Sequence, residues 1–121
     1  MSRRMSCSMT IDAVRARTKT VTRRHVDTWK DLKAGDRLTL IEKGMGLAKG
    51  ERQVVLAEVE IVDVRVESIG HVTFEKRATR NEGLPHMKTA EFVAFWLKGH
   101  GYPADASPGM IPCRRIEWRY V

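Results

Sequence analysis

The sequence predicts a mainly-β domain of the α+β class, in which a few helices flank a bent sheet. Apolar and polar residues alternate through residues 54–68 and again through residues 114–121, a pattern typical of strands. Helical spacing of apolar residues is strong only in residues 89–101. The chain has 121 residues, of which 42% are hydrophobic and 31% charged, so we expect one domain over residues 1–121.

The first elements are a short helix and a short strand. Thr10 is a suitable N-cap for a helix over residues 11–17, which carries Asp12 in its first turn and arginines in its last. Residues 19–24 read Lys-Thr-Val-Thr-Arg-Arg, and their β-branched side chains favour a strand. The chain therefore turns from helix to strand near Lys19.

A second strand follows a turn. Residues 29–36 predict a helical turn that ends at Gly35, and residues 37–43 predict a strand with Leu38 and Leu40 on one face.

A glycine-rich loop and a long strand come next. Residues 43–51 read KGMGLAKGE and favour a hairpin loop over a phosphate-binding loop, because no Lys-Ser/Thr pair follows the glycines. In residues 54–68 the apolar alternation changes phase between Ile61 and Val62, which predicts a β-bulge or a break between two strands. Long bent strands are typical of barrels.

The C-terminal third predicts a helix and a closing strand. Thr89 is the expected cap of the helix over residues 89–101. Its aromatic stripe indicates core packing and comprises Phe92, Phe95 and Trp96. In the closing strand, the residues expected on one face are Ile116, Trp118 and Tyr120.

The positive charge is concentrated near the start of the chain. The formal net charge is +7, and the first 24 residues hold seven basic residues and one acidic residue, leaving +6 there. A polyanionic partner is the natural inference, RNA first and DNA as an alternative, although a solvated basic face has the same composition.

Other classes of site and location have little support. Cys7 and Cys113 have no partner at metal-ligand spacing, and the four histidines form no such spacing either, so we expect no metal and no cofactor. Polar residues interrupt the start of the chain, and no apolar run is long enough to span a membrane. We therefore expect a cytoplasmic protein.

The basic strand has two faces. In an extended chain Thr20, Thr22 and Arg24 project to one side, opposite Val21 and Arg23. Lys19 converges with Thr22 only if Lys19 lies at the turn that precedes the strand.

At these residues the sequence resembles the ASCH domain, a relative of the PUA fold. The resemblance runs over nearly the whole chain through RTKTVTRR, LKAGDRL, LAEVEIVDVRVES, EGLPHMKTAEFVAFW and RRIEWRYV. It implies a partly closed β-barrel with two to three flanking helices around a basic cleft that binds RNA or a modified nucleoside. The residues expected to bind are Lys19, Thr20, Thr22, Arg23 and Arg24.

The chain is also similar to a small branch of acetylcytidine amidohydrolases. Lys19 and Thr22 match its Lys-x-x-Thr pair, Arg24 matches the arginine that follows, and Glu82 matches its glutamate, with Glu75 as a rival. Binding without cleavage is the first hypothesis. The alternative is an amidohydrolase in which Thr22 is the nucleophile, Lys19 the base and Glu82 its support. A ribonuclease is the third hypothesis.

Overall fold

The protein is described by a computed structural model that covers residues 3–44 and 47–121, and its centre is one five-stranded mixed sheet. The strands, in the order β1-β3-β4-β5-β2 across the sheet, are β1 (Arg3–Ser6), β3 (Arg37–Ile41), β4 (Val55–Ser68), β5 (Pro112–Tyr120) and β2 (Val21–His25). β1 runs parallel to β3, and the other pairs are antiparallel.

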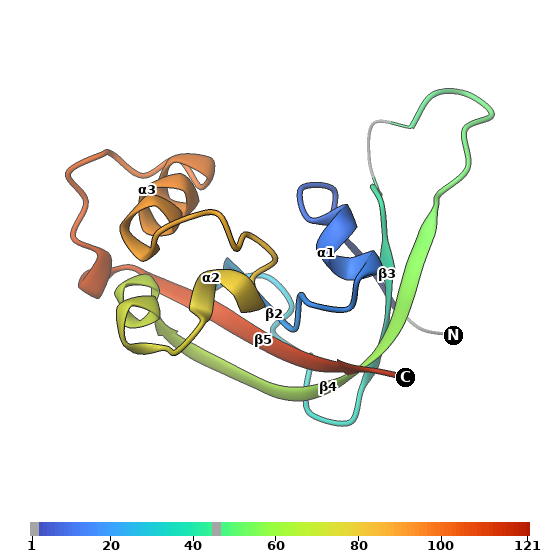
Figure 1. Cartoon of the computed structure of the whole chain (residues 1–121), viewed down its shortest axis with the longest axis horizontal. Helices are drawn as coiled ribbons and strands as arrows, with labels where there is room; N and C mark the ends of the chain where they lie inside the picture. Colours follow the sequence, from blue (N-terminus) through green and yellow to red (C-terminus); the bar gives the residue numbers. More distant parts are fainter. Residues whose placement is uncertain (1–2, 45–46) are drawn as a thin grey trace.

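Short helices flank this sheet (Figure 1). The α-helices are α1 (Ile11–Arg15), α2 (Ala78–Asn81) and α3 (Thr89–Gly99), and the 3₁₀ helices are η1 (Ile69–Phe74) and η2 (Pro108–Met110). Figure 1 shows β4 bending along its length, so that the sheet curls into a half-barrel whose two edge strands are β1 and β2. The predicted mainly-β, partly closed barrel of the α+β class is confirmed.

The bend in β4 coincides with the predicted phase change. Its register against β5 shifts between Ile61 and Asp63, where one extra residue is inserted. Ile61 is buried on the core side, whereas Val62 is 45% exposed. The expected β-bulge is therefore confirmed, and the strand continues through it without a break.

The loop before β4 joins two antiparallel neighbours. β3 and β4 pair through Leu38 and Val59, so their connection is the predicted hairpin. Residues 45–46 of this loop lie outside the described residues.

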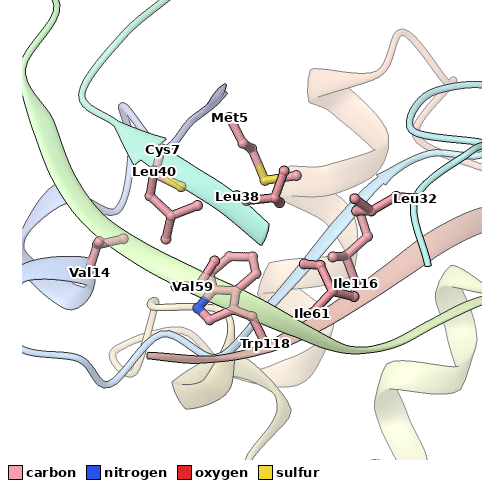
Figure 2. Close-up of a cluster of buried hydrophobic side chains, with 10 residues drawn as sticks. All are labelled: Met5, Cys7, Val14, Leu32, Leu38, Leu40, Val59, Ile61, Ile116 and Trp118. Atoms are coloured by element: carbon pink, nitrogen blue, oxygen red, sulfur yellow. The ribbon is translucent and has the colours of Figure 1, made fainter. Parts of the chain in front are cut away.

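Two apolar clusters occupy opposite faces of the sheet. The first fills the curl of the barrel (Figure 2) and contains Met5, Cys7, Val14, Leu32, Leu38, Leu40, Val59, Ile61, Ile116 and Trp118. The second lies between the sheet and the helices η1, α2 and α3, and it contains Ile69, Val72, Ala78, Phe92, Val93, Trp96, Leu97 and Cys113. Alternation along β5 accounts for the division, because Ile116 and Trp118 enter one cluster and Cys113 the other.

Some local details differ from the sequence prediction. Residues 29–36 form turns rather than a helical turn, although Gly35 does adopt a positive φ of 92°. The N-cap of α3 is Lys88, one residue before Thr89, because the Glu91 carboxylate accepts the Lys88 backbone N–H at 3.1 Å. In the described part of the chain, no helix has both the length and the apolar character required to cross a membrane.

Candidate functional site

A cleft of about 240 Å³ lies at the open seam of the barrel. One wall is the segment that leaves β1, and the opposite wall is the edge strand β2 with the turn before it. The remaining walls come from the end of α2 and from α3. Because β2 pairs only with β5, side chains from both of its faces reach the cleft along its free edge.

Four of the sequence-predicted residues meet in this cleft: Lys19, Thr22, Arg24 and Glu82 all line it. Arg23 lines it as well, but Thr20 does not. The backbone of Thr20 instead joins two elements, donating to the Asn81 carbonyl and accepting from Trp118 N–H. Glu82 rather than Glu75 is thus the carboxylate of the cleft.

Lys19 lies at the predicted turn between α1 and β2. Its carbonyl accepts hydrogen bonds from Trp118 Nε1 at 3.1 Å and Tyr120 Oη at 2.5 Å, which fix the backbone. Its ammonium donates to the carbonyls of Val21 at 3.0 Å and Glu82 at 2.5 Å. Burial lowers the pKa of Lys19, and the nearby Glu82 carboxylate offsets only part of this shift.

Glu82 is placed by a tight turn at the end of α2. Gly83 follows with a φ of +87°, and a β-carbon there would lie 3.0 Å from Ala13 and 3.1 Å from Thr10. The turn therefore requires glycine both for its backbone angle and for its close approach to α1. Glu82 Oε2 lies 3.8 Å from Lys19 Nζ. Burial raises the pKa of Glu82 against the opposing effect of Lys19 and Arg23.

The Arg23 guanidinium is enclosed by three carboxylates. Its Nη1 lies 3.2 Å from Glu82, and its Nη2 lies 2.7 Å from Glu75 and 3.3 Å from Glu67. Glu75 also accepts from Arg115 Nε at 2.7 Å. Burial acts to raise the pKa of Glu75, but the bonds and charges of Arg115 and Arg23 outweigh it and hold that pKa below its usual value.

The contacts of Arg23 lie within the protein, and its predicted role in ligand binding stays a prediction. The Arg23 side chain has no exposed surface, and its guanidinium donates to three protein carboxylates. Among the described residues, Arg23 Nε and Glu75 Oε2 are the buried polar side-chain atoms without a hydrogen-bond partner. Arg23 is therefore placed to hold Glu82 in position.

Thr22 and Arg24 lie on the same face of β2 and are joined to each other. Arg24 Nε donates to Thr22 Oγ1 at 3.2 Å. Arg24 Nη2 donates across the seam to the carbonyl of Ser6, the last residue of β1, at 2.7 Å. Arg24 thus links the two edges of the open barrel directly beside the cleft.

An aromatic wall contributed by α3 was missed by the sequence analysis. Phe92, Phe95, Trp96 and His100 line the cleft. Trp96 and His100 stack with their ring centres 3.8 Å apart, and Trp96 Nε1 donates to the Arg23 carbonyl at 2.9 Å. The sequence predicted Phe92, Phe95 and Trp96 as a stripe that packs in the core. Only the tertiary arrangement shows that this stripe also faces the cleft.

The N-terminal cations are mostly engaged within the protein. Lys19 and Arg23 are buried, and Arg24 is half-buried across the seam. The partners of the other four are Asp31 for Arg3, Gln53 for Arg4, Glu42 for Arg15 and the Tyr120 ring for Arg17. These four arginines remain exposed, so the part of the basic run that is buried or half-buried is Lys19, Arg23 and Arg24.

The chemistry available in the cleft is hydrogen bonding beside aromatic rings. Within residues 3–44 and 47–121, no group of three His, Cys, Asp or Glu side chains converges as a metal site would require. Glu82 Oε2 accepts no hydrogen bond from the described residues, and the Thr22 hydroxyl donates none to them. These atoms remain available to a ligand.

Comparison with solved structures supports the fold. The crystal structure of protein EF3133 from Enterococcus faecalis V583, of the family DUF984, matches with a TM-score of 0.64 and 16% identity, covering 100% of this chain and 80% of that one. The crystal structure of hypothetical protein PH0355 matches with a TM-score of 0.66 and 20% identity, covering 100% of both chains. No family model matches the sequence, and no curated protein does so either. These similarities show that the chain shares its overall fold with these two proteins, and they do not extend to an activity.

Proposed function

We propose that the protein binds a modified nucleoside, with its base in the cleft at the barrel seam. The observation that carries the proposal is the convergence of Lys19, Thr22, Arg24 and Glu82 on one cleft of about 240 Å³ with an aromatic wall. Ligand sites combine apolar and aromatic walls with a few polar groups that fix orientation. Flat rings beside hydrogen-bonding groups suit a heterocyclic base.

The free polar atoms favour a cytosine-like edge. Glu82 Oε2 is an acceptor 3.8 Å from Lys19 Nζ, and Thr22 and Arg24 supply donors to the same cleft. Cytosine presents an amino N–H donor next to acceptor atoms, which is the complementary pattern. Uracil presents a carbonyl where cytosine has its amino group, so it would set an acceptor against the Glu82 carboxylate.

The cations of the cleft favour a nucleoside over a long RNA strand as the ligand. Lys19 and Arg23 are buried, and Arg24 donates to the Ser6 carbonyl, so the cleft itself offers few cations to a phosphate backbone. RNA remains the second candidate partner, reached through a base flipped into the same cleft.

Calorimetric titration tests the proposal. Acetylcytidine and cytidine should bind, uridine should bind at least tenfold more weakly, and Glu82→Gln should reduce cytidine affinity about ten- to a hundredfold, the cost of one charge-assisted hydrogen bond. Glu91→Gln is the matched control, because Glu91 caps α3 away from the cleft. Equal binding of all three nucleosides, or none, contradicts the proposal. Affinity for RNA that falls steeply with added salt would instead favour RNA as the ligand.

A second candidate function is amide hydrolysis at the same cleft. The specific observation is that Lys19, a buried lysine of lowered pKa, and Thr22 line the same cleft. In this reaction Thr22 Oγ1 bonds to the acetyl carbon while its proton passes to the neutral Lys19 amine. The bond from the acetyl carbon to the cytidine nitrogen then breaks, and that nitrogen takes the proton. Water hydrolyses the resulting ester and restores Thr22.

Chromatography separates binding from hydrolysis. Incubation with acetylcytidine should release cytidine and acetate in the wild type if the second function holds, and Thr22→Ala should release neither. If the Thr22→Ala protein still binds acetylcytidine, its loss of turnover comes from the missing nucleophile and not from weaker binding. Equal turnover in both proteins would exclude Thr22 as the nucleophile.

A further inference from the structure

A second hollow of about 770 Å³ adjoins the cleft. We define it as the α1 groove, which lies between α1 with its preceding loop and the segment after Glu82. Its lining includes Met9, Asp12, Ala16, Glu42, Leu84 and His86. Neither the proposed binding of a base nor the hydrolysis of an acetyl group uses this space.

The groove and the cleft share one rim. Ser8, Met9, Thr10 and Leu84 line both hollows. Gly83 lines the groove and lies between Glu82, which lines the cleft, and Leu84, which lines both. The close approach of Gly83 to Thr10 and Ala13 fixes this rim against α1. The two hollows therefore meet along this rim, which follows Glu82 in the sequence.

The lining of the groove indicates the chemical nature of such a group. Met9 on the shared rim is 68% exposed and presents an apolar surface to a ligand. The charged residues of the lining are Asp12, Arg15 and Glu42, of which Arg15 and Glu42 form an ion pair at 3.7 Å. These three side chains together carry one net negative charge, which disfavours an anion in the groove.

We infer that the cleft accepts a base whose exocyclic amine carries an aliphatic substituent, and that this substituent extends into the α1 groove, ending in a neutral or cationic group. The inference rests on the proposed function, because it places the base at Glu82. It extends that function by naming the modification as a long, uncharged or cationic chain rather than a small or acidic group.

Four cytidines alkylated on the exocyclic nitrogen test this inference by calorimetry, because an alkyl link cannot be hydrolysed. The substituents are methyl, hexyl, 6-aminohexyl and 5-carboxypentyl. Hexyl should bind about tenfold tighter than methyl through partial burial of the chain. The 6-aminohexyl compound should bind about fivefold tighter than the 5-carboxypentyl compound through the charge of Asp12.

Two variants of exposed residues locate the effect. Ala16→Trp fills the groove, so it should remove the gain of the hexyl chain and leave the methyl compound unchanged. Asp12→Asn should remove the preference between the two charged chains and keep the gain of the hexyl chain. Equal affinity for methyl and hexyl compounds in the wild type, or a hexyl gain that survives Ala16→Trp, overturns the inference and leaves the proposed function standing. Failure of every compound to bind overturns both.

Discussion

Replacement of Arg23 by methionine is the perturbation with the largest effect on the site. Methionine keeps much of the apolar stem and removes the guanidinium, which leaves Glu67, Glu75 and Glu82 without the cation that they share. Removal of one partner from a buried ion pair costs about 3–5 kcal/mol. Glu75 keeps its bond to Arg115, whereas Lys19 at 3.8 Å is the one cation left to Glu82 among the described residues.

The expected loss can be converted into a melting temperature. For a chain of this length, about 1 kcal/mol corresponds to roughly 4 °C, so Arg23→Met should melt about 12–20 °C below the wild type. Urea denaturation followed by tryptophan fluorescence gives the free energy of unfolding directly. The matched control is Arg65→Met, because the Arg65 side chain is 49% exposed although it also contacts two carboxylates. That variant should lose less than about 1 kcal/mol.

The pH dependence of the loss gives a second check. Without Arg23, Glu82 loses a charge that lowers its pKa, so burial raises that pKa further above its value in the unfolded chain. The destabilisation is therefore present above that folded pKa and is relieved as pH falls through it. The difference in the free energy of unfolding between wild type and Arg23→Met should therefore become smaller as the pH falls from 8 to 5. A loss no larger than that of Arg65→Met, or a gap that widens on acidification, would refute the reasoning.

Three further predictions concern the lysine, the turn and the seam. Burial lowers the pKa of Lys19 below its ordinary 10.5, so the charged Lys19 destabilises the folded protein. This destabilisation is relieved as the pH rises from the lowered pKa towards 10.5. The unfolding free energy of the wild type should thus rise with pH relative to Lys19→Met; parallel curves would contradict this. Gly83→Ala should lower the unfolding free energy by at least about 1 kcal/mol more than Gly101→Ala, because both have positive φ but only Gly83 meets α1. Equal decreases in the unfolding free energy of the two variants would contradict a role for the close approach of Gly83 to α1. Arg24→Ala should weaken cytidine binding about tenfold in calorimetry, whereas Arg114→Ala, which breaks bonds to a carbonyl outside the cleft, should not.

Local patterns in the sequence were sufficient to predict much of the fold. The phase change at Ile61 and Val62 predicted the bulge in β4, because alternation along a strand records which face is buried. The β-branched run after α1 predicted β2 and placed Lys19 at the turn before it. Both features depend on neighbours a few residues apart.

The environment of Arg23 could not be predicted in the same way. Its carboxylate partners come from the end of β4, the residue after η1 and the end of α2, which are brought together only by the curl of the sheet. The sequence shows only that several basic residues follow one another. It does not distinguish an arginine that is exposed from one that is buried against carboxylates. The assignment of the α3 aromatics to the core was incomplete for the same reason, since Trp96 packs in the second cluster and also lines the cleft.

The most direct test of the account is an NMR titration of the wild type with acetylcytidine, observed through the indole N–H signals of the three tryptophans. Trp96 lines the cleft, and Trp118 donates to the Lys19 carbonyl, whereas Trp29 packs beside Arg3. We predict that the Trp96 signal shifts most, that Trp118 shifts less and that Trp29 does not move. No shift in any of the three signals, or a shift confined to Trp29, would contradict the placement of the ligand in the cleft.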